Sequence, residues 1–560
     1  MTRPDWWRGA VIYQIYPRSF LDSNGDGVGD LPGVTARLDH VASLGVDAIW
    51  LSPFFASPQR DFGYDVSHHT AVDPLFGTLA DFDALVARAH VLGLKVLIDQ
   101  VWSHTSDRHP WFLDSRTSRT STHAEWYVWA DPAPDGTAPN NWLSVFGGPA
   151  WTWEPRRRQY YLHHFLTYQP ALNLHEPAVM DALLESGAFW LDRGVDGFRL
   201  DAIDFMLHDP RLRSNPPAPR PEVMPAKLFG LQRHVHDMLQ PEAIGLLGRI
   251  RGLMDRYPDR VALGEVSSQP GAFARVATTT AGRDRLHMAY TLSPLRGGFD
   301  WATITSLLRD LAVAGEGGWP CWSFSNHDVE RAVSRWAPGG TRDPAFARLL
   351  MAFLLSLRGS VSLYQGEELG LPEAHLAEQD LRDPFGIAFW PEFRGRDGSR
   401  TPMPWQAHAA HAGFTTAEAP WLPVPAVHRS LAVDAQEADP GVLLHAYRRF
   451  LAWRRTQPAL RLGALRPLAL AEPLVGFVRE HAGERVLAVF NLSDRTVLLD
   501  LSALATVRPL VESGFAVALE AGRGALPPYG VLFGVLEFGA PAAEGTHGLV
   551  QRVLAGAAGT

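Results

Sequence analysis

The chain contains 560 residues, of which 46% are hydrophobic, and its 51 basic and 60 acidic side chains give a formal net charge of −9. This acidic balance argues against nucleic acid or an anionic membrane as a partner. The single cysteine, Cys321, excludes an intramolecular disulfide framework and favours a reducing compartment. Because the sequence has no run of about 20 apolar residues and no signal-peptide pattern near its start, we expect a soluble, cytoplasmic protein.

Short β-branched or aromatic runs alternate along the chain with longer segments such as Leu79–His90, in which apolar residues recur at helical spacing. Strand–helix alternation repeated eight times predicts an α/β fold, a (β/α)₈ barrel. The eight runs that we predict to be its strands are Val11–Tyr16, Ala48–Leu51, Val96–Ile98, Gly197–Leu200, Val261–Leu263, His287–Leu292, Trp322–Phe324 and Val361–Tyr364.

Two connections are too long for ordinary loops. Residues 105–172, after the third strand, predict an inserted subdomain, and the Pro-rich segment Pro210–Pro225 predicts an irregular excursion over the barrel mouth. Strand patterns without intervening helices predict an all-β C-terminal domain; they are Leu474–Val478, Arg485–Asn491, Val497–Leu501 and Val531–Leu536. We therefore expect the barrel to comprise residues 1–104 and 173–462, the inserted subdomain residues 105–172, and the C-terminal β domain residues 463–560.

Residues 22–30 alternate oxygen-bearing side chains with small residues. The expected ligands, like those in the first three-quarters of an EF-hand loop, are Asp22, Asn24, Asp26, the carbonyl of Val28, and Asp30. The twelfth position is Gly33 instead of the bidentate Glu, so the loop is not a complete EF-hand. Three carboxylates in one turn repel one another without a cation. We expect a structural divalent ion, calcium ahead of magnesium, and no organic cofactor; a solvated acidic turn is the alternative.

Ionisable groups stand where the predicted strands end. Asp201 ends its strand with Arg199 on the same face, and a nearby cation should lower the carboxyl pKa and keep it ionised. Glu265 ends an apolar strand with no basic residue adjacent in sequence, so burial should raise its pKa. Asp328, beside His327, supplies a third carboxylate. Two carboxylates with opposed pKa values suit cleavage of a glycosidic bond. The alternative is that these carboxylates only form salt bridges at the mouth of the barrel.

These residues lie in ordered motifs that resemble the α-amylase superfamily of glycoside hydrolases, and within it the α-glucosidase and oligo-1,6-glucosidase branch. The resemblance runs from about Trp6 into the C-terminal β domain. Ser103 stands where most relatives have Asn, and Ala171 where Asp is usual. The matching segments are Asp61–Asp65, Asp99–His104, Gln169–Asn173, Gly197–Asp201, Gly264–Glu265, Phe324–Asp328 and Arg396–Trp405.

The resemblance implies a retaining double displacement. Asp201 is then the nucleophile, Glu265 the acid/base and Asp328 the transition-state stabiliser. The residues that the resemblance places around the sugar are Asp61, Tyr64, His104, Phe165, Arg199, His327 and Arg396. For Phe165, a core position is the alternative.

Specificity follows from the same resemblance. A pair like Asp61 and Arg396 closes the pocket around the terminal sugar, which implies an exo-acting enzyme that releases one glucose. Ala202, after the nucleophile, is typical of relatives that cleave α-1,4 bonds, whereas Val there is typical of α-1,6 cleavage. Ser103 together with Ala202 resembles a subgroup that transfers glucose to hydroxyl acceptors. We expect small oligosaccharide or glucoside substrates; the oligomeric state is not readable.

Other interpretations stay open. The chain resembles oligo-1,6-glucosidases and the sucrose- or maltose-isomerising members of the superfamily, so either activity is an alternative. A catalytically inactive homologue acting as a sugar-binding subunit is disfavoured, because Asp201, Glu265 and Asp328 are all present and the sequence shows no membrane anchor. A calcium-binding structural protein would leave these strand-end carboxylates unexplained.

Overall fold

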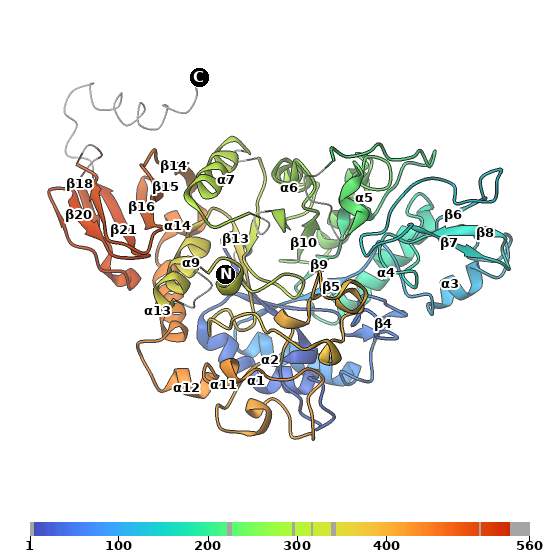
Figure 1. Cartoon of the computed structure of the whole chain (residues 1–560), viewed down its shortest axis with the longest axis horizontal. Helices are drawn as coiled ribbons and strands as arrows, with labels where there is room; N and C mark the ends of the chain where they lie inside the picture. Colours follow the sequence, from blue (N-terminus) through green and yellow to red (C-terminus); the bar gives the residue numbers. More distant parts are fainter. Residues whose placement is uncertain are drawn as a thin grey trace.

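The computed structural model describes residues 5–220, 227–293, 297–314, 317–337, 343–502, 504 and 506–537. Its centre is an eight-stranded parallel sheet (Figure 1). The strands are β1 (Val11–Ile15), β2 (Ala48–Leu51), β5 (Lys95–Gln100), β9 (Gly197–Leu200), β10 (Val261–Val266), β11 (Met288–Thr291), β12 (Cys321–Ser323) and β13 (Ser360–Tyr364). β13 pairs with β1, and a parallel bridge between Ala289 and Pro320 brings β11 to β12, which nearly closes the barrel. The fold prediction is confirmed, with every predicted barrel strand in place.

A helix follows each barrel strand, directly or after an insertion. Local sequence sets the helix ends: Thr78 and Asp81 form a capping box at the start of α2, and Gly45 ends α1 with a φ of 86° that suits glycine. The surrounding helices are α1 (Leu31–Leu44), α2 (Leu79–Val91), α4 (Pro177–Asp192), α5 (Ala243–Met254), α6 (Ala272–Thr280), α7 (Trp301–Ala314), α9 (Pro344–Ser356) and α13 (Leu443–Arg455).

Alternate side chains of the barrel strands fill its interior, since side chains along a strand point to opposite faces. Ile12, Trp50, Leu97 and Leu263 pack together there with almost no exposure. Cys321 is free and lies in the same cluster, as expected of a small apolar core residue. A barrel filled in this way leaves its strand ends and loops to form a site.

The insertion between β5 and α4 contains α3 (Pro110–Ser115) and a small antiparallel sheet with the order β6-β8-β7. Its strands are β6 (Trp129–Ala130), β7 (Trp151–Glu154) and β8 (Gln159–Leu162). A second pair, β3 (Phe55–Ala56) and β4 (His68–Val72), lies between β2 and α2. The predicted excursion after β9 is irregular as far as residue 220, and residues 221–225 of it lie outside the described residues.

The C-terminal part is built from two antiparallel sheets, β14-β15-β16-β21-β18 and β17-β20-β19. Its strands are β14 (Ala464–Pro467), β15 (Leu474–His481), β16 (Glu484–Asn491), β17 (Val497–Asp500), β18 (Thr506–Pro509), β19 (Leu519–Glu520), β20 (Arg523–Leu526) and β21 (Val531–Glu537). The prediction of an all-β C-terminal domain is confirmed. The short helices before it are α8 (Ala332–Arg335), α10 (Pro384–Phe389), α11 (Ala426–Arg429), α12 (Val433–Glu437) and α14 (Pro458–Leu462).

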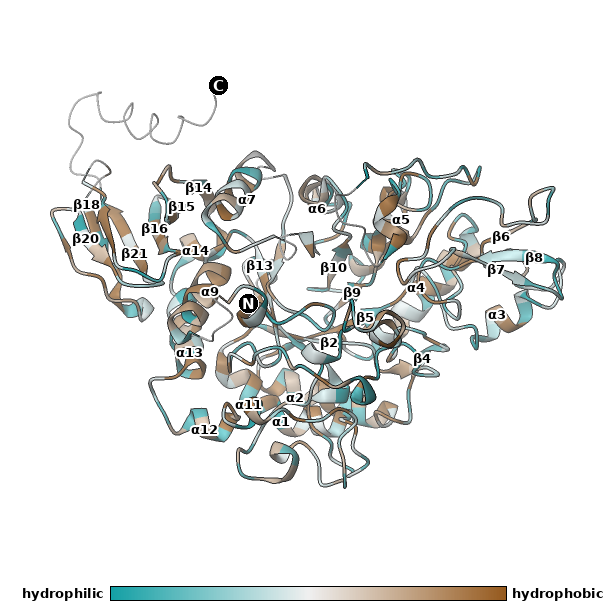
Figure 2. Cartoon of the chain, viewed as in Figure 1, coloured by the Kyte–Doolittle hydropathy of each residue, from teal (hydrophilic) through white to brown (hydrophobic). Residues whose placement is uncertain are grey.

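Helix α9 joins the barrel to the C-terminal sheets. Figure 2 shows it largely in brown, as a hydrophobic helix, whereas α12 is mostly teal. Phe353 of α9 packs against Phe490 of β16, with ring centres 5.1 Å apart. None of the described helices combines the length and hydrophobicity needed to cross a membrane. The cytoplasmic location stays a prediction.

Candidate active site

A cavity of about 700 Å³ opens at the carboxyl ends of the barrel strands, the face on which barrel enzymes carry their active sites. Arg199 and His327 stand behind its wall, fully buried. The predicted site residues that line it are Asp61, Tyr64, His104, Phe165, Asp201, Ala202, Glu265, Asp328 and Arg396. The structure therefore gathers into one site residues that are far apart in the sequence.

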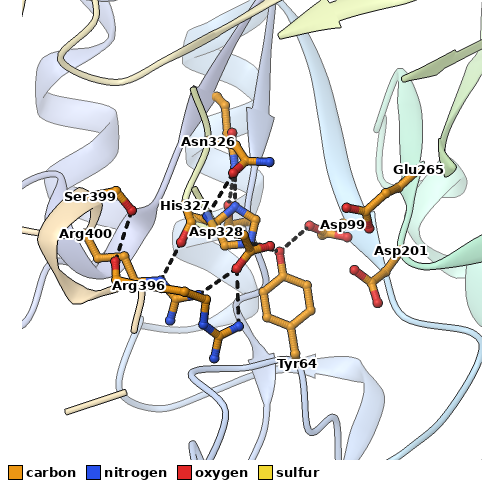
Figure 3. Close-up of polar contacts among 12 residues, drawn as sticks. Tyr64, Asp99, Asp201, Glu265, Asn326, His327, Asp328, Arg396, Ser399 and Arg400 are labelled. Atoms are coloured by element: carbon orange, nitrogen blue, oxygen red, sulfur yellow. Dashed lines mark hydrogen bonds and ion pairs between the residues drawn. The ribbon is translucent and has the colours of Figure 1, made fainter. Parts of the chain in front are cut away.

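Arg199 bridges three carboxylates. Its Nη1 donates to Asp99 at 2.8 Å and to Asp201 at 2.7 Å, and its Nη2 donates to Glu265 at 2.6 Å. Strand register explains the cluster: Arg199 on β9 lies opposite Asp99 on β5 and opposite Leu263 on β10, so that Asp201 and Glu265 stand level with each other. The guanidinium also donates to the Tyr290 hydroxyl at 2.6 Å. Figure 3 shows Asp99, Asp201 and Glu265 side by side.

The titration of this cluster agrees with the sequence-based expectation for Glu265 and differs from it for Asp201. Burial raises the pKa of Glu265 to about 7, against the attraction of Arg199 and with the help of the negative charges of Asp201 and Asp328. Burial also raises the pKa of Asp201 to about 7, and Arg199 only partly opposes it because Asp99 lies in the same cluster. The expectation of a lowered Asp201 pKa is therefore wrong, because one guanidinium is shared among three carboxylates. Glu265 also has a cation beside it, Arg199, although no basic residue is adjacent to it in the sequence.

Asp328 lies in a more cationic setting. Its Oδ1 accepts from Arg400 at 2.8 Å and from Arg396 at 3.2 Å. Burial acts to raise its pKa, but His327, Arg396 and Arg400 outweigh burial and hold the pKa well below its usual range. Asp328 therefore stays ionised, a fixed negative charge facing the cavity across from Asp201 (Figure 3).

One end of the cavity is closed by a buried ion-pair cluster. Arg396 Nη2 donates to Asp61 at 2.8 Å and to Asp383 at 2.8 Å. Gln169 donates to the other oxygen of Asp61 at 2.9 Å. These side chains are at most 8% exposed, so the end wall is desolvated and its hydrogen bonds are charge-assisted.

A hydrogen-bond chain extends from Asp99 of the carboxylate cluster through Tyr64 and His327 to Gln14. The Tyr64 hydroxyl lies 3.1 Å from Asp99 and 2.6 Å from His327 Nε2, and Gln14 contacts the other ring nitrogen of His327 at 2.8 Å. The rings of Tyr64 and His327 stack almost in parallel, with 5.3 Å between their centres. This chain holds Tyr64 as a rigid face of the cavity.

His104 and Phe165 form the neighbouring wall. His104 Nε2 lies 3.1 Å from the Tyr64 carbonyl and 3.3 Å from the side-chain nitrogen of Gln169. Nδ1 lies 2.9 Å from the Ser103 hydroxyl, so Ser103 holds the ring orientation where relatives are expected to have Asn. Burial lowers the pKa of His104 to about 3. Phe165 is half-buried and packs against His104 with ring centres 5.1 Å apart.

Ala202 has a strained backbone. Its φ of 46° and ψ of 47° lie in the left-handed region, which is costly for any residue with a Cβ and most costly for β-branched ones. Its N–H donates to Glu265 at 3.2 Å. The turn after the nucleophile candidate thus helps to hold the second carboxylate, and it presents only a methyl group to the cavity.

The predicted metal loop is closed by its own hydrogen bonds. Asp22 accepts from the N–H groups of Gly25 at 2.7 Å and Gly27 at 2.8 Å, Asp26 accepts from Val28 at 2.8 Å, and Asp30 caps α1. Within the described ranges, no group of three or more His, Cys, Asp or Glu side chains is arranged to hold a metal. Carboxylate, amide and carbonyl oxygens still suit a hard cation, and the divalent ion stays a prediction.

Several residues of the site were not singled out from the sequence. Tyr290 lies inside the predicted strand His287–Leu292, two residues before its end. Asp383 lies in an irregular segment without a strand-end position, and Arg400 stood inside the quoted segment Arg396–Trp405 without a role. Gln169 and Asp99 stood inside quoted motifs but received no role.

Comparison with known proteins identifies the protein family of this chain. Residues 14–463 match the family model for the alpha amylase catalytic domain. The chain is 53% identical over 540 residues to a probable alpha-glucosidase of Rhizobium meliloti strain 1021, covering 94% of this chain and 97% of that protein. It is 34% identical over 534 residues to an oligo-1,6-glucosidase of Parageobacillus thermoglucosidasius, covering 89% and 92%. The crystal structure of an alpha-glucosyl transfer enzyme superposes with a TM-score of 0.92 at 54% identity, covering 96% of this chain and 100% of that one.

Proposed function

Because this chain belongs to the α-amylase family and is a glycoside hydrolase that acts on α-glucosides, we propose that it is a retaining, exo-acting α-glucosidase. Its substrates are short α-1,4-glucosides such as maltose, and it also transfers glucose to hydroxyl acceptors. The observation that carries this proposal is the Arg199 bridge between Asp201 and Glu265, in a cavity whose end is closed by Asp61 and Arg396.

The two carboxylates act in sequence. Asp201 attacks the anomeric carbon while Glu265 gives its proton to the leaving oxygen, and a β-glucosyl ester forms on Asp201. Glu265 then takes a proton from water or from another hydroxyl, whose oxygen displaces Asp201 and restores the α configuration. One guanidinium that contacts both carboxylates keeps them close, which suits retention, where the separation is about 5–5.5 Å.

Asp328 stabilises the transition state. It is held ionised by Arg396 and Arg400, so its negative charge is in place before positive charge develops on the sugar ring. Such preorganised charge strengthens binding of the oxocarbenium-like state more than binding of the substrate. Tyr64, His104 and Phe165 line the same part of the cavity and provide faces for the sugar.

Attack from the chain end follows from the closed wall. A cavity ended by the Asp61–Arg396 pair accepts one terminal glucose and leaves the rest of the substrate toward the mouth. Ala202 also lines the cavity, and its small side chain leaves room for an α-1,4-linked sugar next to the terminal glucose. The 54% identity to an alpha-glucosyl transfer enzyme supports transfer as part of the activity, whereas the oligo-1,6-glucosidase relative keeps α-1,6 cleavage as the alternative.

The test is a time course of products with maltose, isomaltose and sucrose supplied separately, with the anomer followed by polarimetry. We expect α-glucose to be released first, with maltose preferred over isomaltose. Asp201→Asn should lower kcat by at least about 10⁴-fold, on the scale of losing a catalytic nucleophile, while the melting temperature stays close to that of the wild type. Initial release of β-glucose would exclude retention, and rearranged disaccharide without free glucose would indicate an isomerase.

A further inference from the structure

A strap of residues 227–237, between β9 and α5, lies at the mouth of the cavity. Contacts within and beside the strap hold residues 229–236 in place. The Phe229 ring stacks on His234 with 3.6 Å between centres, and the His236 carbonyl accepts from the Asp209 N–H at 2.6 Å. Gln232 bridges to Pro217 and donates to the Asn141 carbonyl at 2.6 Å. These contacts fix the strap to its own side of the cavity.

Lys227 joins the strap to the opposite side. Its ammonium lies 3.8 Å from the ring centre of Phe385 on α10 and 4.1 Å from that of Phe393. These two rings also contact each other, at 4.7 Å. The lysine is therefore held between two aromatic rings that belong to the segment after β13, more than 150 residues away along the chain.

The two sides that Lys227 joins form an aromatic outer wall of the cavity. Phe205 faces Phe229 on the strap side, and Phe146 packs against Phe385 on the other side with 4.5 Å between centres. All of these rings line the cavity, as do Lys227 and Phe393. Since the inner end is closed by Asp61 and Arg396, a leaving group or an acceptor must bind within this outer wall.

We propose that Lys227 is a specificity-determining residue that favours glucosyl transfer over hydrolysis, by holding the strap against Phe385 and Phe393 so that the outer wall stays assembled around a bound acceptor. This inference rests on the proposed function. In both outcomes the bond from the anomeric carbon to Asp201 breaks, an oxygen takes its place and Glu265 receives the proton; only the source of the oxygen differs. A cation held by aromatic faces shifts an equilibrium by roughly 2- to 30-fold, enough to favour the arrangement in which the strap contacts Phe385 and Phe393.

The experiment measures how the glucosyl-enzyme partitions. With p-nitrophenyl α-glucoside as donor and benzyl alcohol at a fixed concentration, p-nitrophenol reports every turnover, free glucose reports hydrolysis and benzyl glucoside reports transfer. We expect Lys227→Met, which keeps the length and removes the charge, to lower the transfer-to-hydrolysis ratio by about 5-fold, within the range for a lost cation–π contact. Lys227→Arg should retain most of the ratio, and Phe393→Leu should lower it in part.

Phe389→Leu is the matched control, because Phe389 packs on Phe385 with ring centres 5.5 Å apart but does not line the cavity. Backbone amide exchange in residues 228–232 should accelerate in Lys227→Met and not in the control. An unchanged ratio in active Lys227→Met, or an equal fall in the control, would overturn this inference alone. If the wild-type enzyme yields neither free glucose nor benzyl glucoside, the proposed function fails, and this inference fails with it.

Discussion

Arg199 donates to Glu265 over 2.6 Å although 66 residues separate them in the chain. The contact exists because β9 and β10 are parallel neighbours whose register sets Glu265 level with Asp201. The same guanidinium holds Asp201, and the negative charge of Asp201 helps burial to raise the pKa of Glu265. Their shared setting determines the pH dependence of the reaction.

The first prediction concerns pH. The first step needs Glu265 protonated and Asp201 ionised. Burial raises the pKa of Glu265 to about 7, so kcat/KM should fall as pH rises through about 7 and the acid loses its proton. Burial also raises the pKa of Asp201 to about 7, so kcat/KM should fall as well when pH drops below about 7 and Asp201 gains a proton, which makes the profile a narrow bell near neutral pH. The measurement is the pH profile of kcat/KM, which reports the free enzyme.

Glu265→Gln separates the two limbs of this profile. With a dinitrophenyl α-glucoside, whose leaving group needs no protonation, the variant should keep its acid limb and lose its basic limb. Glu392→Gln is the matched control, because Glu392 lines the cavity but is exposed at its mouth, and its profile should stay as in the wild type. A basic limb that persists in Glu265→Gln would assign that limb to another group.

Much of the fold follows from local sequence, and the exceptions have physical reasons. The barrel strands are continuous apolar runs because they are buried on both faces. Strand β20 was missed because Arg523–Leu526 combines a charge with a glycine and is largely exposed, so its pairing with β17 owes little to its own pattern. Residue-level strand propensity depends strongly on such context.

The site was predictable where a side chain ends a strand, and not where spatial neighbours decide its chemistry. Asp201, Glu265 and Asp328 could be identified from their positions. The raised pKa of Glu265 could also be predicted, but that of Asp201 could not, because burial outweighs Arg199, whose charge Asp99 shares. Asp383 could not be identified either, since its contact with Arg396 depends on an irregular segment folding back on itself.

The second prediction concerns the closed wall. Arg396→Met should lower kcat/KM for maltose by at least about 100-fold and the free energy of unfolding by about 3–5 kcal/mol, because Asp61 and Asp383 would remain buried without their cation. The readouts are kinetics and denaturant unfolding. Arg394→Met, an exposed neighbour, should change the free energy of unfolding by less than about 0.5 kcal/mol and leave kcat/KM unchanged.

A double-mutant cycle that combines Arg396→Met with Asp61→Asn separates the effect of the Asp61–Arg396 contact from a general loss of stability. If the Asp61–Arg396 contact matters, the double variant should lose clearly less kcat/KM and less free energy of unfolding than the two single losses added together as free energies. Strictly additive effects would show that the two residues act independently, and the argument for exo action from this wall would fall.

The third prediction concerns the loop of residues 22–30. A bound divalent ion stabilises the folded state by about 2.7 kcal/mol when its concentration is 100 times the Kd, so calcium should raise the melting temperature and a chelator should lower it. The effect should reach beyond the loop, because Asp22 and Gly27 hydrogen-bond to Phe414 and Trp421. Asp26→Asn should abolish the response to calcium. Equal responses in the variant and the wild type would place any ion elsewhere.

The last prediction concerns linkage preference and Ala202. Ala202→Val fills space beside the site of the leaving sugar, so maltose cleavage should fall relative to isomaltose cleavage, by about 10-fold or more. Valine is also strained at a φ of 46°, which will reduce overall activity and stability whatever the substrate. The measured quantity is therefore the ratio of the two kcat/KM values, from which a uniform loss cancels. Ala202→Gly, which relieves the strain and leaves the space open, should preserve the preference for maltose; a ratio that is the same in all three proteins would remove Ala202 from the determinants of linkage.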